Sequence, residues 1–118
     1  MVKVLVVEDN PLNMELVIEI LQARNFTVHE AVNGEDALRK AEVENYDLIL
    51  MDIELPGMDG VEVTRILKAK NKKTPVIALT SYAMKGDRDR FLAAGFEEYL
   101  PKPLDITDFL NRLDKYKA

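Results

Sequence analysis

The sequence predicts an α/β fold in which helices cover both faces of a doubly wound parallel sheet. Two features of the chain lead to this prediction. Short apolar runs, the pattern of strands buried on both faces, alternate five times with segments whose apolar residues recur at helical spacing. In addition, polar residues stand directly where several of these runs end. With 118 residues the chain has the length of one domain, and we expect a single domain over residues 1–118.

The strands are expected where apolar residues form short runs, at 2–7, 27–31, 47–52, 75–80 and 97–100. Crossover connections between parallel strands are right-handed, which leaves few possible sheet orders. Among these, the flavodoxin-like order 2-1-3-4-5 is the natural arrangement of five strands, with five helices packed on the two faces. The binding crevice of such a sheet lies at the carboxyl ends of the first and third strands, where the order reverses.

The helices are expected between and after the strands. In the first and last helical segments the apolar residues follow the i, i+3, i+4, i+7 spacing of a helix face. These residues are Met14, Val17, Ile18 and Leu21 in the first segment and Ile106, Phe109, Leu110 and Leu113 in the last. Shorter stretches of the same pattern occur within 37–41, 63–67 and 91–95.

The expected helix boundaries carry chemical signals. A proline follows Asn10, which is typical of a cap before the first helical turn. Asp59 and Glu62 have the spacing of a capping box. Asn25 and Gly95 are residue types that commonly end helices. These signals agree with the boundaries that the apolar periodicity predicts.

Polar side chains follow four of the five predicted strands. They are Glu8 and Asp9 after the first strand, Asp52 at the end of the third, Thr80 at the end of the fourth and Lys102 after the fifth. The carboxyl ends of parallel strands open onto one crevice. Four separate segments are therefore expected to supply one site.

The acidic residues of this site point to a divalent cation. Without a counter-charge, Glu8, Asp9 and Asp52 would repel one another and raise one another's pKa. A hard cation resolves this repulsion, and oxygen ligands with room for water and a phosphate favour Mg²⁺. An isolated Glu-Asp pair is more often part of a solvated loop, but the expected place of this pair opposite Asp52 favours the metal site.

Asp52 is the candidate nucleophile. The apolar run 48–51 carries its carboxylate from a buried sheet to the rim, where it can attack phosphorus. The alternative is a role as a turn or helix cap. The following turn at 56–60 already has a cap of its own in Asp59. Asp52 is therefore left for another role.

Lys102 and Thr80 are candidates for contact with a phosphoryl group. Lys102 lies between two prolines, and its ammonium can neutralise a phosphoryl oxygen. The bond from Lys102 to Pro103 is a place where a cis peptide can turn the lysine inward. Thr80 can donate its hydroxyl to another phosphoryl oxygen, although a lone Thr is more often an ordinary strand residue.

Composition excludes several classes of function. A net charge of -5 and a pI near 4.9 argue against a nucleic-acid surface, which needs clustered Lys and Arg. The chain has no cysteine, which excludes disulfides, thiolate metal sites and cysteine catalysis. No apolar stretch approaches membrane-spanning length and the N-terminus lacks a signal-peptide pattern, so we expect a soluble cytoplasmic protein with no membrane partner.

Over residues 2–116 the chain resembles the receiver domains of two-component response regulators, in both the order and the spacing of its motifs. The matching residues are Glu8, Asp9, Asp52, Pro56, Gly57, Gly60, Thr80, Tyr99, Lys102 and Pro103. The stretch 80–87 is similar to that of DivK-type single-domain regulators and of receivers fused to hybrid histidine kinases.

The resemblance implies a phosphoacceptor that works in signal transduction. Asp52 would take a phosphoryl group from a phosphohistidine on a histidine kinase or a histidine phosphotransfer protein. Asp9, Asp52 and the backbone carbonyl of Glu54 would hold Mg²⁺ directly, while Glu8 would act through a bound water. The activity implied is phosphotransfer and autodephosphorylation, not the turnover of a conventional enzyme.

The resemblance also implies a conformational switch. Thr80 and Lys102 would contact the phosphoryl oxygens, and Tyr99 would turn inward as the Thr80 hydroxyl moves to the phosphoryl group. This would remodel the face of the fourth helix, fifth strand and fifth helix, where a downstream protein is expected to bind. The oligomeric state expected is a monomer or a weak dimer.

Two positions, Glu8 and Glu54, are unusual for this family, and a third, Tyr82, is expected at the entrance of the site. Glu8 replaces the Asp that is common there, which lengthens one arm of the site and keeps its charge. Glu54, two residues after Asp52, adds an acidic side chain beside the site, and Tyr82, two residues after Thr80, adds bulk at the same entrance. We hypothesise that Glu54 and Tyr82 control the rate of dephosphorylation.

Other functions fit parts of the pattern. A phosphatase of the haloacid-dehalogenase type would place its nucleophilic Asp after the first strand, and a flavin-binding protein would have a hydroxyl- and glycine-rich loop there. A receiver that binds partners without phosphorylation is a third alternative. A receiver excised from a hybrid kinase is a fourth, but Met1 directly before the first strand and an end soon after the last helix fit a stand-alone protein better.

Overall fold

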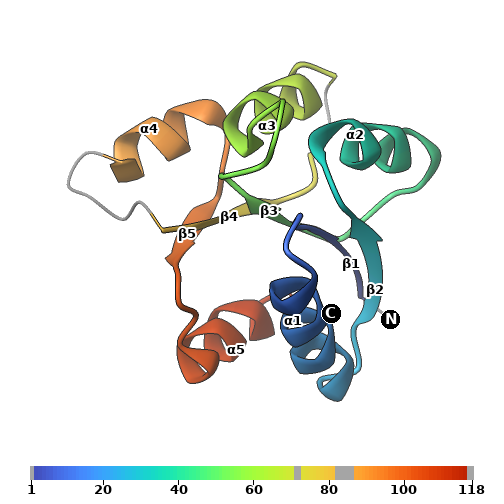
Figure 1. Cartoon of the computed structure of the whole chain (residues 1–118), viewed down its shortest axis with the longest axis vertical. Coiled ribbons are helices and arrows are strands. Elements are labelled where there is room, and N and C mark those ends of the chain that lie inside the picture. The colour runs from blue at the N-terminus through green and yellow to red at the C-terminus, as the bar shows by residue number, and fades with distance from the viewer. Residues whose placement is uncertain (1, 71–72, 82–86, 117–118) are drawn as a thin grey trace.

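The computed structural model describes residues 2–70, 73–81 and 87–116, in which five strands alternate with five helices (Figure 1). The strands are β1 (Lys3–Val7), β2 (Thr27–Ala31), β3 (Leu48–Asp52), β4 (Val76–Thr80) and β5 (Glu98–Pro101). The helices are α1 (Pro11–Ala23), α2 (Gly34–Val43), α3 (Gly60–Ala69), α4 (Asp87–Ala94) and α5 (Ile106–Asp114).

The sheet is parallel throughout and has the order β2-β1-β3-β4-β5, which confirms the predicted topology. Its register aligns the strand ends. Val7 of β1 pairs with Met51 of β3, and Thr80 of β4 pairs with Pro101 of β5. Residues at or just after the carboxyl ends of β1, β3, β4 and β5 therefore lie next to one another, along the carboxyl end of the sheet.

Each face of the sheet carries its own apolar core. Helices α2, α3 and α4 cover one face, and α1 and α5 cover the other (Figure 1). Every residue of β3 and β4 is buried. Because strands covered on both sides need no polar face, they read as continuous apolar runs, which is why the sequence located them.

The observed caps agree with the predicted helix boundaries. The side-chain oxygen of Asn10 accepts hydrogen bonds from the backbone N–H groups of Leu12 and Asn13 at the start of α1. Asn25 and Gly95 have positive φ angles of 66° and 108°, as expected for residues that end helices. Two apolar positions differ: Ile106, the first residue of α5, is 48% exposed, and Leu92 on α4 is 43% exposed.

Among the helices of the described residues, none combines the length and the apolar character that crossing a membrane requires. The longest of these helices is α1, with 13 residues.

Gly60 fixes the approach of α3 to the end of β3. Its backbone N–H donates to the carbonyl of Ile53 at 3.1 Å. A Cβ atom at this position would lie 2.3 Å from the carbonyl oxygen of Asp52, closer than a real side chain can come. Glycine is therefore needed here for close backbone contact, and that contact supports the segment that carries Asp52.

We predict that Gly60→Ala lowers the free energy of unfolding by about 3 kcal/mol, the upper end of the usual cost of overpacking, because the backbone atoms it would contact cannot move aside. The matched control is Gly57→Ala. Gly57 has a φ of 76°, but a Cβ atom added there would meet no atom within 4 Å, so its variant should lose only about 1 kcal/mol of backbone energy. Urea unfolding followed by circular dichroism measures both, and an equal loss in the two variants would contradict the steric argument.

Candidate functional site

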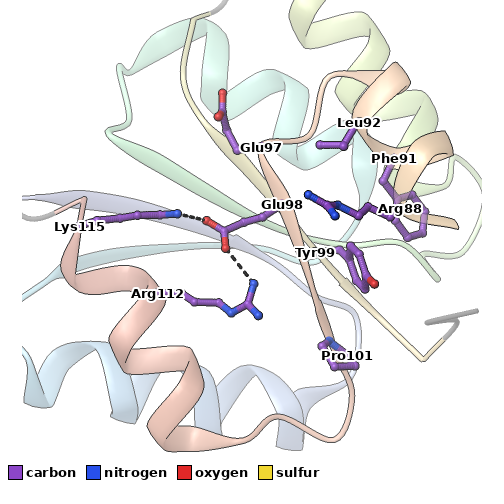
Figure 2. A pocket seen from close by; sticks show the side chains of 9 residues that line it. All are labelled: Arg88, Phe91, Leu92, Glu97, Glu98, Tyr99, Pro101, Arg112 and Lys115. Carbon is purple, nitrogen blue, oxygen red and sulfur yellow. Dashed lines mark hydrogen bonds and ion pairs between the residues drawn. The ribbon is translucent and has the colours of Figure 1, made fainter. Parts of the chain in front are cut away.

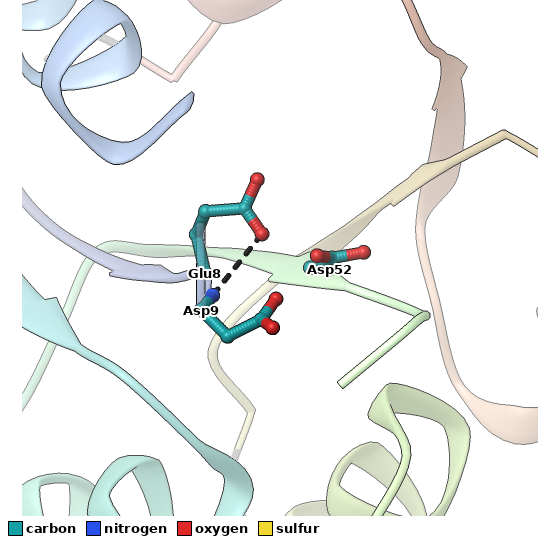
Figure 3. Close-up of side chains that lie close together, drawn as sticks. All are labelled: Glu8, Asp9 and Asp52. Atoms are coloured by element: carbon teal, nitrogen blue, oxygen red, sulfur yellow. Dashed lines mark hydrogen bonds between the residues drawn. The ribbon is translucent and has the colours of Figure 1, made fainter. Parts of the chain in front are cut away.

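Three carboxylates meet at the carboxyl ends of β1 and β3 (Figure 3). Glu8 and Asp9 follow β1, and Asp52 is the last residue of β3. One carboxylate oxygen from each lies within 4.8 Å of the others. Glu8 and Asp52 are each only 2% exposed, whereas Asp9 is exposed to solvent. The acidic cluster that the sequence predicted at the reversal of the sheet order is therefore present.

Lys102 brings a positive charge to this cluster. Its Nζ lies 3.1 Å from Oδ1 of Asp52, 3.5 Å from Oε1 of Glu8 and 3.9 Å from Oε2 of Glu54. The backbone N–H of Lys102 donates to the carbonyl of Thr80 at 2.8 Å, and the Lys102–Pro103 peptide bond is cis. The side chain thus points from the end of β5 toward the end of β3.

One ammonium does not balance the carboxylates around it. Burial alone would lower the pKa of Lys102, but the charge and hydrogen bond of Asp52, followed by the charge of Glu8, raise it. Burial also raises the pKa of Glu8 from 4.5 to about 7, with a further rise from the neighbouring Asp52 carboxyl. Lys102 therefore stays charged and pairs mainly with Asp52, while Glu8 lacks a full counter-charge.

Glu54 reaches across the site to the end of β4. Its Oε1 accepts a hydrogen bond from the backbone N–H of Ser81 at 2.8 Å and one from Oγ1 of Thr80 at 3.4 Å. Its backbone N–H in turn donates to Oδ1 of Asp52 at 2.9 Å. The sequence identified Glu54 and Thr80 but not Ser81, whose only signal was its place directly after a predicted strand end.

Tyr99 lies apart from the acidic cluster. It is partly buried on β5, where its ring centroid is 5.9 Å from that of Phe91. Tyr99 lines a pocket between α4, β5 and α5 (Figure 2). The volume of this pocket is about 550 Å³. Tyr82, the other aromatic residue that the sequence singled out, lies outside the described residues.

Glu98, which also lines this pocket, links β5 to α5 and to the residues just after α5. Its carboxylate accepts a hydrogen bond from Arg112 at 3.1 Å and pairs with Lys115 at 2.6 Å (Figure 2). It also accepts a hydrogen bond from the hydroxyl of Tyr116 at 3.1 Å. Burial would raise the pKa of Glu98, but these partners on α5 and just after it lower it. The fifth helix is thus fastened to the edge strand by charge as well as by apolar packing.

The donor set of the acidic cluster fits a hard divalent cation. The three groups offer only oxygen ligands, one of them is exposed to water, and their mutual repulsion is not fully offset by Lys102. Mg²⁺ characteristically takes a few carboxylates and keeps several waters. The arrangement can therefore hold a hard cation beside Asp52.

Comparisons with known proteins agree with this geometry. The family model of the response regulator receiver domain matches residues 4–114. The chain is 42% identical to the polar-differentiation response regulator DivK of Brucella anthropi, over 96% of this chain and 94% of that protein.

Two solved structures extend the comparison. The receiver domain of a sensor histidine kinase from Pseudomonas aeruginosa, which has a magnesium ion in its active-site cleft, is 38% identical, with a TM-score of 0.87 and 97% and 95% of the two chains covered. The response regulator TrrA of Thermotoga maritima, solved with Mg²⁺ and beryllofluoride, is 36% identical, with a TM-score of 0.89 and 99% and 100% covered.

The burial of the Glu8 carboxylate beside Asp52 predicts a pH dependence of stability in the absence of metal. Because the pKa of Glu8 is higher in the folded protein, the folded state binds the proton more tightly, and stability falls as pH rises from 4.5 to about 7. We expect a loss of about 1 to 3 kcal/mol across this window, and we expect Glu8→Gln to remove it. Urea unfolding in EDTA at several pH values measures the difference between the two proteins.

The matched control for this experiment is Glu15→Gln, which removes the same charge from an exposed position on α1. It should keep the pH profile of the unaltered protein. A Glu8→Gln profile parallel to that of the unaltered protein would show that burial of Glu8 does not govern the effect.

Proposed function

This chain belongs to the response regulator receiver domain family, and on that premise we propose that Asp52 accepts a phosphoryl group from a phosphohistidine of a partner protein. The observation that carries the proposal is the pairing of a buried Asp52 with Lys102 beside two further carboxylates. This pairing provides a nucleophile, a cation for a phosphoryl oxygen and ligands for a metal in one place.

The proposed step transfers a phosphoryl group from a donor, the phosphohistidine, to an acceptor, Asp52. A carboxylate oxygen of Asp52 forms a bond to phosphorus as the bond from phosphorus to the histidine nitrogen breaks, and the electron pair of that bond stays with the imidazole. Hydrolysis later returns the carboxylate and inorganic phosphate. Because such a reaction is catalysed mainly by positioning and by neutralising charge, Lys102 and the hydroxyl of Thr80 are proposed to contact the phosphoryl oxygens.

We propose that Mg²⁺ is the cofactor of this step. Asp9, Asp52 and the backbone carbonyl of Glu54 would hold it directly, with Glu8 acting through a water. When bound, the cation would neutralise charge on the phosphoryl oxygens and on the carboxylates. The close approach of the three carboxylates supports this assignment.

Thr80 and Tyr99 are proposed to pass the signal to the surface. Thr80 pairs with Pro101 across the sheet and accepts the backbone hydrogen bond of Lys102, so the end of β4 is joined directly to the strand that carries Tyr99. Movement of the Thr80 hydroxyl toward a phosphoryl group would shift Tyr99 within its pocket. A downstream protein that binds one state of this pocket more tightly would then respond to phosphorylation.

The phosphodonor is proposed to bind on the opposite side of the site, at α1. A second pocket of about 390 Å³ runs from Glu8 and Lys102 to Leu16 and Leu104. Leu12 and Leu16 are exposed on α1, at 76% and 45%. Leu16, which lines this pocket, and Leu12 on the same helix offer an apolar surface for a histidine kinase or a phosphotransfer protein in the cytoplasm. We propose that residues 1–118 act as one receiver domain, as a monomer or weak dimer.

We also propose that Glu54 and Tyr82 control how long the phosphoryl group remains. Glu54 lies at the entrance with its carboxylate 3.9 Å from the Lys102 ammonium. An unchanged half-life of the aspartyl phosphate in Glu54→Asn would contradict its part in this control. The same measurement on Tyr82→Ala tests the second residue.

The proposal predicts a phosphoryl adduct on Asp52. Intact mass spectrometry after incubation with acetyl phosphate and Mg²⁺ should show one base-labile adduct, which disappears in Asp52→Asn and when EDTA replaces Mg²⁺. Asp89→Asn, an exposed aspartate on α4, is the matched control and should keep the adduct. If the unaltered protein binds Mg²⁺ but shows no adduct, it is a binding module that works without phosphorylation.

Lys102→Met tests whether the Lys102 ammonium offsets the negative charge of Asp52 and Glu8. Without metal, it leaves Asp52 and Glu8 buried with no cation, and we expect the free energy of unfolding to fall by about 2 to 4 kcal/mol. Saturating Mg²⁺ should restore part of this loss, because the cation supplies the missing charge. Calorimetric titration should also show tighter Mg²⁺ binding in the variant. Equal stability of the two proteins in EDTA would mean that Lys102 is not the main counter-charge.

A further inference from the structure

We propose that the side chain of Glu54 is a built-in competitor of the phosphoryl group. Its carboxylate holds the same hydrogen-bond donors that an incoming phosphoryl group needs, so phosphorylation of Asp52 has to displace it. This inference rests on the proposed function, since it concerns access to the same site. It assigns to Glu54 a specific role before phosphorylation, in addition to any effect on the lifetime of the product.

Three residues contact the Glu54 carboxylate: Thr80, Ser81 and Lys102. The backbone N–H of Ser81 donates to Oε1 at 2.8 Å, and the Thr80 hydroxyl lies 3.4 Å from the same atom. The hydroxyl of Ser81 lies 3.4 Å from Oε2, and the ammonium of Lys102 lies 3.9 Å from it. A hydroxyl, a backbone N–H and an ammonium that converge on one anion form the kind of donor set that binds phosphoryl oxygens.

The position of Glu54 allows its carboxylate to leave these hydrogen-bond donors, so that a phosphoryl group can take its place. Lys102 is closer to Asp52, at 3.1 Å, than to Glu54, at 3.9 Å. The Glu54 side chain is 29% exposed, compared with 3% for Asp52. Glu54 can therefore turn out to water without breaking the main ion pair of the site, and its vacated donors can then bind the phosphoryl oxygens.

Two costs oppose phosphorylation as long as the carboxylate is present. The hydrogen bond from the backbone N–H of Ser81 has to be given up, and a displaced Glu54 still places a negative charge near an anionic group. Both costs fall on any anion that binds beside Asp52. A weak phosphodonor therefore leaves Asp52 mostly unphosphorylated. A strong or well-oriented donor is needed to displace the Glu54 carboxylate.

Beryllofluoride, a non-covalent analogue of a phosphoryl group, is a suitable probe because its binding is an equilibrium and does not depend on dephosphorylation. We expect Glu54→Gln to bind it about tenfold more tightly than the unaltered protein in saturating Mg²⁺, which is the size of one charge-assisted hydrogen bond. The substitution keeps the shape of the side chain, so the fold should be preserved. The matched control, Glu62→Gln at an exposed position on α3, should bind as the unaltered protein does.

The amide resonance of Ser81 gives a readout that overall stability does not move. In the unaltered protein it should shift both when beryllofluoride is added and, in its absence, when Glu54 is changed to Gln. Titration with Mg²⁺ alone separates any change in metal affinity from the effect on the anion. Glu54→Ala also removes the hydrogen-bond acceptor that Gln keeps for the Ser81 N–H group, and it should bind beryllofluoride at least as tightly as Glu54→Gln does.

The outcomes are distinct. Affinity for beryllofluoride within twofold of the unaltered protein, or weaker, in both Glu54 variants would overturn the competition. A Ser81 resonance that does not respond to loss of the carboxylate would also overturn it. If neither the unaltered protein nor the variants bind beryllofluoride although all bind Mg²⁺, the proposed phosphoacceptor function fails, and the inference fails with it.

Discussion

The ion pair between Lys102 and Asp52 is the interaction on which the rest of the site depends. It forms because the sheet order places the end of β3 next to that of β4. The hydrogen bond from the backbone N–H of Lys102 to the carbonyl of Thr80 then directs the lysine inward. One ammonium then faces several carboxylates, and burial, together with the neighbouring Asp52, raises the pKa of Glu8. The site is thus built with a shortage of positive charge, and a divalent cation or a proton is what relieves it.

Much of the fold can be predicted from the sequence, for an identifiable reason. Strands such as β3 and β4 are buried on both faces, so their residues form unbroken apolar runs that reveal where each strand ends. The residues at those ends, Asp52 and Thr80, then follow from topology. The family match sets aside the phosphatase and flavin-binding alternatives, which the pattern alone left open.

Other features could not be predicted, because they depend on side-chain packing. The spacing of Ile106 suggested a buried helix face, yet a residue at the very start of a helix has fewer neighbours to cover it. Nothing in the local sequence indicates that Glu54 turns toward Ser81 or that Glu98 is surrounded by donors from α5. Such contacts join segments far apart in the chain, and only the folded structure brings them together.

The prolines around Lys102 also affect how the sheet can meet another protein. β5 is an edge strand, and an exposed edge invites a further strand to add to it by backbone hydrogen bonds. Pro101 and Pro103 have no N–H group to donate, which interrupts the edge at the end nearest the site. This end of the edge therefore disfavours the addition of a further strand and the growth of larger sheets.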